Sequence, residues 1–195
     1  MKKIKDVTWQ EIFESWRDRE AHNPGWIECA TKIKGWPDWA LWRSFTAQQI
    51  DAVNRKWEMF QLSNPVEEIP EMLIGPYSGW QSRVVHKNKT TFKELLEVPG
   101  QYEEWSNHAG VLAIMNGMPF TTELIGLLRK DIDKIVCLDG HHRATAISLA
   151  QKQGKRIDFS QTPITIALTE ISANDCQLFD DLLERGTTKN PQTAP

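Results

Sequence analysis

The chain has 195 residues, a formal charge of −3 at pH 7, 40% hydrophobic residues and 25% charged residues. This length suits one domain, or one and a half, and it allows a sizeable core without disulfides or structural metal ions. The composition excludes collagen-like, disordered and disulfide-scaffold proteins. The negative charge disfavours a general nucleic-acid-binding domain, but it leaves room for a local basic patch or a small anionic ligand.

Three isolated cysteines, Cys29, Cys137 and Cys176, form no CxxC pair. This pattern indicates a reducing compartment rather than a disulfide framework or a zinc site, and we expect three small buried side chains. No apolar run follows the first lysines, and no stretch approaches the roughly 20 apolar residues of a membrane span. We therefore expect a cytoplasmic protein without membrane contact.

Eight of the nine tryptophans lie in the first 80 residues, so the chain has two compositional halves. A capping box at Thr8–Glu11 predicts a helix that ends near Glu20, and a second helix is predicted from Pro37. Another capping box at 46–49 predicts an amphipathic helix of about four turns that extends to residue 60. Its apolar positions are Ile50, Val53, Trp57 and Phe60.

The second half alternates short apolar runs with helical segments. Residues 68–74 predict a short extended segment. A third capping box, at Thr91–Glu94, predicts a short helix that ends before Pro99. The remaining predicted elements are a helix over 102–116, a hairpin-like pair of strands over 124–128 and 132–138, a helix over 142–153, a strand over 163–168, an amphipathic helix over 174–185 and a disordered tail over 187–195.

The motif Asp139-Gly140-His141-His142-Arg143 follows a predicted strand and begins a predicted helix. Such turns bind anions, because the free N–H groups and the helix dipole leave partial positive charge there, and a glycine lets a ligand approach the backbone. Cationic side chains in a first helical turn are each disfavoured by roughly 0.3–1 kcal/mol, and a bound phosphate would reverse this repulsion. We expect the turn to lie at the rim of a cleft, with two basic side chains on the anion and one packed. The alternative is that Asp139 caps the helix and the basic side chains are solvated or paired with nearby acids.

The segment from Val136 to Ala146 resembles the signature of the ParB/sulfiredoxin superfamily, in which a strand-Gly-x-[His/Arg]-Arg-helix turn holds nucleotide phosphates. It is most similar to the Asp-Gly-His-His-Arg form of the free serine kinases of that superfamily. The order of predicted elements over residues 65–172 is also similar. The resemblance implies that Gly140 is the turn glycine, that His142 and Arg143 bind phosphate, and that Asp139 lies near the metal or the transferred phosphoryl group.

The resemblance also suggests two residues outside the motif. Lys93, in the short helix expected beside the nucleotide, is a second candidate phosphate ligand, with an ordinary exposed lysine as the alternative. Glu71 follows the first strand of the resembling region and is the candidate general base. His141 stands where sulfiredoxins have a catalytic cysteine, so sulfinic-acid repair is not supported. His-His-Arg in place of Glu-Arg-Arg, with only about 50 residues following, argues against ParB-type DNA binding.

Trp36, Trp39 and Trp42 recur every three residues across one broad helix face. We expect them to form an aromatic core or lid, with stacking on a base or ring as the alternative. His86 and His108 have no metal-ligand spacing to another residue and are expected at the surface.

The patterns predict an α+β protein with a small mixed sheet and surrounding helices, and the resemblance implies a ParB/sulfiredoxin-like core. The predicted parts are a Trp-rich helical extension (1–64), the core (65–172), a C-terminal helix (173–186) and a disordered tail (187–195). The expected function is phosphotransfer or hydrolysis with ATP, ADP or CTP, together with Mg²⁺, on a small-molecule or protein acceptor. The alternatives are a nucleotide- or phosphate-sensing module whose Trp-rich half binds a protein, and a ParB-like nuclease. Candidate catalytic residues are Asp139 and Glu71, and candidate cofactor-binding residues are Gly140, His141, His142, Arg143 and Lys93.

Overall fold

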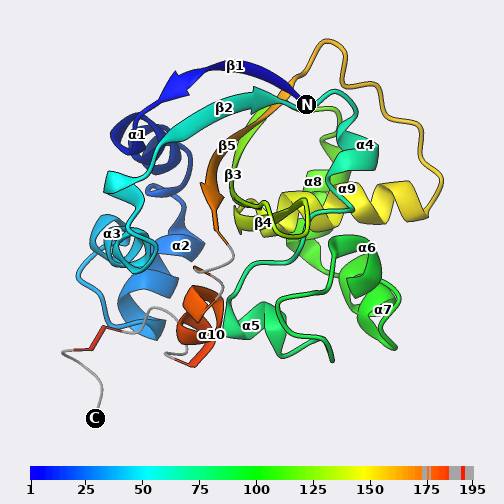
Figure 1. Ribbon diagram of the computed structural model, residues 1–195. Helices are drawn as coiled ribbons and strands as arrows, with labels where there is room; N and C mark the ends of the chain where they lie inside the picture. Colours follow the sequence, from blue (N-terminus) through cyan, green and yellow to red (C-terminus); the bar gives the residue numbers. More distant parts are fainter. Residues whose placement is uncertain (173–174, 176, 185–189, 192–195) are drawn as a thin grey trace.

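The computed structural model describes residues 1–172, 175, 177–184 and 190–191. Within them, a five-stranded mixed sheet in the order β1-β2-β5-β3-β4 lies between two groups of helices (Figure 1). The parallel pair is β3 with β5, and the other neighbouring strands are antiparallel. The predicted α+β class, a small mixed sheet with surrounding helices, is confirmed. The strands are β1 (Lys2–Val7), β2 (Trp57–Gln61), β3 (Thr122–Arg129), β4 (Lys134–Asp139) and β5 (Ile164–Ile171).

The first helical group comes from the Trp-rich part of the chain and begins where the sequence predicts. Thr8 and Glu11 form the predicted capping box of the first helix. Asn23 caps the second helix, and Asp38 caps the third, which starts just after the predicted position. The helices of this group are α1 (Trp9–Glu20), α2 (Pro24–Glu28) and α3 (Trp39–Gln49), with a π-helical turn over Cys29–Ile33 between the last two.

The second helical group covers the opposite face of the sheet. The predicted capping box of Thr91 and Glu94 begins its helix over residues 92–95. The helix predicted over 102–116 is two helices, because the Nδ1 atom of His108 accepts the N–H of Val111 and starts a new helix there. The helices of this group are α4 (Pro65–Glu68), α5 (Ser78–Gln81), α6 (Phe92–Leu95), α7 (Gln101–Ser106), α8 (Ala109–Asn116) and α9 (His141–Lys152). The last helix, α10 (Gln177–Glu184), instead packs Phe179 into the buried cluster on the α1–α3 side, and a 3-10 turn spans Ala52–Asn54 before β2.

Alternating side chains of the sheet bury two separate clusters, one beneath each helical group. On β3, Leu124 packs into the cluster with α9, whereas Ile125 packs into the cluster with α1 and α3. On β5, Ile166 and Ala167 divide in the same way. Because successive strand residues point to opposite faces, a continuous apolar run serves both clusters.

The helix predicted over residues 46–60 is wrong beyond residue 49. α3 ends at Gln49, Asp51 takes a left-handed conformation with φ of 51°, and Trp57–Gln61 forms β2. Trp57 and Met59 are buried on one side of the strand, while Phe60 lies on the opposite side. These side chains therefore alternate between the two faces of a sheet and do not form the apolar face of a helix.

Two further elements differ from the sequence analysis. Strand β1 is not predicted, because five of its six residues are exposed and show no apolar alternation. The extended segment predicted over 68–74 is reduced to isolated bridges of Leu73 with Thr91 and Val136, after the short helix α4. Strands β1 and β2 join β5, so one sheet includes both the 1–64 and the 65–172 regions. The predicted start of the last helix at 174 and most of the tail at 187–195 lie outside the described residues.

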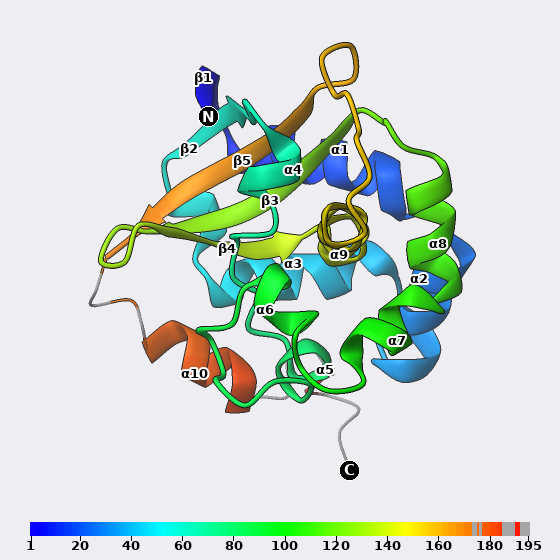
Figure 2. The same cartoon turned by 90° about the vertical axis from the view of Figure 1, so that its right-hand side faces the viewer.

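The helix α9 is oriented so that its N-terminal end points toward the α1–α3 group. In Figure 1 it runs outward from β4, and Figure 2 shows it nearly end-on beneath the strands. The predicted hairpin of β3 and β4 is confirmed and places Asp139 at the end of an edge strand. The positive end of the α9 dipole therefore faces the space between the two helical groups.

Candidate functional site

A cavity of about 760 Å³ lies between the two helical groups at the start of α9. Its walls come from the end of α1, from α2 and α3, from residues 77–80, from the start of α8 and from residues 138–143. Small-molecule sites in proteins commonly have volumes of roughly 300–1,000 Å³. The Asp139–Arg143 turn thus lies at a cleft, as predicted.

Gly140 shapes the turn and occupies the N-cap position of α9. Its φ of +101° favours glycine, and a Cβ there would lie 2.3 Å from Cδ2 of Leu124. Asp139 is the last residue of β4 and does not cap the helix, since no side chain of the described residues caps the N-terminus of α9. A 12-residue helix therefore begins at the cavity without a capping side chain.

Arg143 is tied to the protein on several sides. Its Nη2 atom lies 2.7 Å from Oδ2 of Asp139, and its Nη1 atom donates to Oγ1 of Thr122 and to the carbonyl of Glu123. Burial acts to raise the pKa of Asp139, but Arg143 and Arg43 outweigh it and lower the pKa below its usual value. Arg143 thus neutralises a buried carboxylate as well as facing the cavity, which matches the ion-paired alternative for this side chain.

His141 is the packed member of the motif. Its Nε2 atom accepts the N–H of Gly75 at 3.1 Å, and its Nδ1 atom lies 3.8 Å from Sγ of Cys137. Burial lowers the pKa of His141 to about 3, so the ring is neutral at physiological pH. It holds the loop before α5 against the end of β4.

His142 is partly buried and lines the cavity. Its ring stacks on that of His108, with centroids 5.2 Å apart and an interplanar angle of 25°, and makes no hydrogen bond with the described residues. The rings of Trp80 and Trp26 approach it at 5.4 Å and 6.4 Å. Burial, followed by the neighbouring His108 and Arg143, lowers the pKa of His142 to about 4. At neutral pH it is a hydrogen-bonding group rather than a cation.

Glu20 and Arg43 form the part of the wall beside Arg143, and no sequence pattern predicts either residue. The guanidinium carbon of Arg43 lies 3.9 Å from the ring centroid of Trp42 and 4.8 Å from that of Trp16. The Nε1 atom of Trp16 donates to Glu20 at 3.0 Å. Burial, and then the charge of Asp139, raise the pKa of Glu20 to about 7. A signal was present in the unusual number of tryptophans around these positions, but no local motif marks them.

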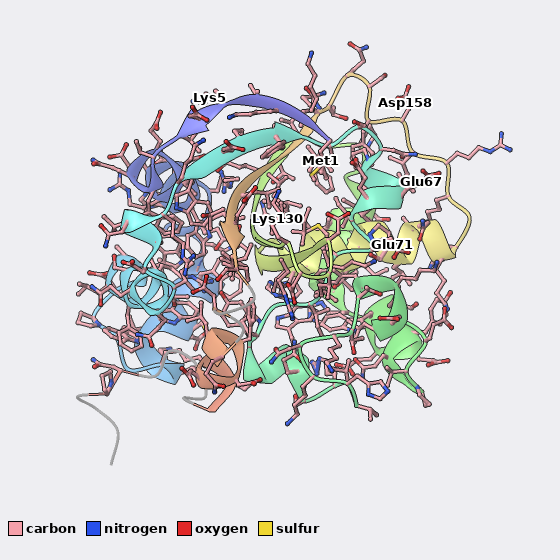
Figure 3. The ribbon with its side chains drawn as sticks, viewed as in Figure 1. Met1, Lys5, Glu67, Glu71, Lys130 and Asp158 are labelled. Carbon is pink, nitrogen blue, oxygen red and sulfur yellow. The ribbon has the colours of Figure 1, made fainter. Side chains whose placement is uncertain are left out.

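Glu71 and Lys93 are not among the residues that line the cavity. Lys93 pairs with Glu71 at 3.5 Å, and Lys134 approaches the same carboxylate at 3.0 Å. Figure 3 labels Glu71 on the side of the molecule where α4 and α9 lie, away from α1–α3. The structure therefore does not bring the predicted base and the predicted second phosphate ligand to the motif.

The other singled-out aromatic and histidine residues fall into two groups. Trp39 is buried in the core, as predicted, whereas Trp42 is buried and also lines the cavity. His86 is exposed, as predicted, but the surface position expected for His108 is wrong, because it is half-buried at the cavity wall. The ring of His108 contacts that of Trp105, with centroids 5.2 Å apart and an interplanar angle of 46°, and its Nδ1 atom caps α8; both contacts hold His108 at the cavity wall.

The described cysteines differ in exposure. Cys137 is buried as expected, and burial raises the pKa of its thiol. Cys29 is half-buried at the cavity, and Cys176 lies outside the described residues.

The donor groups at the site do not fit a resident metal ion. In the part of the chain that the structure describes, no three His, Cys, Asp or Glu side chains are close enough to hold one. One oxygen of Asp139 is already bound to Arg143. A divalent cation would have to enter on the phosphate oxygens of its ligand, as Mg²⁺ commonly does.

Comparison of the chain with protein-family models, with curated proteins and with solved structures finds no match in any of the three. None of the helices among the described residues has the length and apolar character to cross a membrane. The geometry of the cavity is therefore the basis for assigning a function.

Proposed function

We propose that the cavity binds a nucleotide with its phosphate groups at the first turn of α9, and that the protein transfers or hydrolyses one of its phosphoryl groups. The observation that carries this proposal is the uncapped start of a 12-residue helix, which opens through a positive-φ glycine into a cavity of about 760 Å³. Free amide donors and the helix dipole favour phosphate at such a position.

The side chains around the turn support an anionic ligand with an aromatic part. Arg43, Arg143 and Lys34 contribute positive charge to the cavity, and a neutral His142 offers a ring nitrogen at the start of α9. Trp26 and Trp80 are aromatic residues in the cavity wall, and Trp80 already stacks on Trp105, so an aromatic base would extend an existing group of rings. In this proposal the backbone amides and His142 donate hydrogen bonds to the phosphate oxygens. Arg143, held in place by Asp139, contributes positive charge that attracts the phosphate.

A non-catalytic nucleotide sensor is the second candidate, and a specific observation favours it. Neither predicted catalytic carboxylate is free in the cavity, because Asp139 is bound to Arg143 and Glu71 is paired with two lysines elsewhere. Binding without turnover would be the result for a sensor.

Calorimetry with ATP, ADP and CTP in the presence of Mg²⁺ tests binding, and ³¹P NMR of the same mixtures tests turnover. His142→Ala should weaken nucleotide binding about 10- to 100-fold, the equivalent of one hydrogen bond to a charged group. His86→Ala is the matched control, because His86 is exposed and outside the cavity lining. Equal losses in both variants, or no binding to the parent protein, would contradict the proposal.

A further inference from the structure

Glu20 belongs to a compact group of charges in the cavity wall. Its Oε1 atom lies 3.6 Å from Nη2 of Arg143, and its Oε2 atom lies 3.8 Å from Nη2 of Arg43. Arg143 in turn contacts Asp139 at 2.7 Å. The exposed fractions of these four side chains are between 7% and 17%, so water screens them weakly. With both carboxyl groups ionised, two negative and two positive charges cancel.

The remaining groups near Glu20 are neutral or already paired, apart from Lys34. Arg19 lies 3.2 Å from Glu123, with which it forms an ion pair. On the same helix, Trp16 donates a hydrogen bond to Glu20. Tyr77, also in the cavity wall, has a pKa raised by burial and stays neutral. His141 and His142 are neutral because burial lowers the pKa of both. Lys34 adds one positive charge at the cavity rim.

An anionic ligand adds negative charge to this group of charges, and of the two carboxylates Glu20 is the one expected to take up a proton. Asp139 keeps its charge because Arg143 binds it directly at 2.7 Å. Both ion pairs of Glu20 are longer, at 3.6 Å and 3.8 Å, and they involve guanidinium groups that the ligand also attracts. A proton on Glu20 removes one negative charge beside the bound anion.

We propose that Glu20 is the proton carrier of the cavity: a phosphorylated ligand binds together with one proton, which Glu20 holds facing the ligand. The inference rests on the proposed function for the phosphorylated nature of the ligand. It places an acid–base group in the cavity that neither Asp139 nor Glu71 supplies. The protonated form binds the anion better, so affinity falls as pH rises through the pKa of Glu20. The free protein already has this pKa near the physiological range, at about 7.

Inorganic sulfate is a suitable probe because its charge is constant between pH 6 and 9. Side-chain ¹³C NMR of labelled glutamates, with the Glu20 signal assigned by its loss in Glu20→Gln, reports the ionisation directly, and the amide signals of the first turn of α9 report binding. The Glu20 transition should move up by about one pH unit in saturating sulfate, and sulfate affinity should fall about tenfold between pH 6 and 9.

Variants separate Glu20 from the histidines. Glu20→Gln mimics the protonated side chain, so it should bind sulfate with an affinity independent of pH. Glu14→Gln, an exposed position on the same helix, should keep the tenfold pH dependence, and so should His142→Ala, although its overall affinity falls. A pH dependence that survives in Glu20→Gln, or that disappears in His142→Ala, would overturn the proposal.

The outcomes also separate this inference from the nucleotide proposal. If sulfate binds at α9 but does not change the pKa of Glu20, the proposed role of Glu20 is overturned and the nucleotide proposal is not affected. If sulfate raises the pKa of Glu20 but ATP does not displace sulfate, the role of Glu20 is supported and the nucleotide proposal is contradicted. No change in the α9 amides with either sulfate or ATP overturns both.

Discussion

Gly75→Ala is expected to destabilise the protein strongly, because the loop before α5 passes directly over the end of β4. A Cβ at this position would lie 2.1 Å from the carbonyl oxygen of Cys137 and 2.6 Å from Nε2 of His141. The Cys137 oxygen belongs to the sheet backbone, so the loop must move. That movement breaks the buried hydrogen bond from Gly75 N–H to His141. Overpacking costs about 1–3 kcal/mol and an unpaired buried N–H costs about 1–3 kcal/mol, so we expect a loss of about 2–6 kcal/mol.

Urea unfolding followed by tryptophan fluorescence measures this loss. The matched control is Gly79→Ala, four residues later in α5, where a Cβ would meet nothing within 4 Å. The control should leave the free energy of unfolding unchanged or raise it by up to about 1 kcal/mol, since alanine lowers the entropy of the unfolded chain. If both variants unfold at the same urea concentration as the parent, the close packing of this loop on His141 is refuted.

Three further predictions concern the groups around the cavity. Arg143→Ala should lower the free energy of unfolding by about 3–5 kcal/mol, because it leaves Asp139 buried and unpaired. Denaturant titration measures this loss. If adding Asp139→Asn restores stability, the reason is supported, and if stability is not restored, the reason is contradicted. The difference in free energy of unfolding between Glu20→Gln and the parent should increase in favour of the variant by about 3 kcal/mol as pH rises from 4.5 to 7. The reason is that the raised pKa makes ionisation of Glu20 unfavourable only in the folded protein. A difference that does not change with pH would refute this. Cys137 should resist alkylation by iodoacetamide until the protein unfolds, because burial raises the pKa of its thiol. Mass spectrometry of the peptide that contains Cys137 measures the reaction, and alkylation of the folded protein would contradict the prediction.

Local signals predict the elements that surround the motif. The capping boxes at Thr8 and Thr91 predict the starts of α1 and α6, because a cap depends on residues only three positions apart. The apolar runs of β3 and β4, and the helix after Gly140, are predicted for a similar reason. Here the local preference and the tertiary packing agree.

Long-range packing decides what the sequence does not predict. Trp57 lies in a strand, although its spacing from Ile50 and Val53 fits a helix, because β2 pairs with β1 and β5. Glu20 and Asp139 are 119 residues apart in the chain, and their shared contact with Arg143 depends on how α1 packs against the end of β4. No spacing rule connects such residues, whereas the five consecutive residues of the motif are visible at once.

A crystal structure of the protein with ATP and Mg²⁺ tests the central claim most directly. We predict phosphate oxygens within about 3 Å of the backbone nitrogens of His142 and Arg143, the hydrogen-bond distance for amide donors, with the base against the aromatic wall that includes Trp80. A nucleotide bound outside this cavity, or a cavity that holds only solvent at millimolar ATP, would contradict the claim that α9 begins a phosphate-binding site.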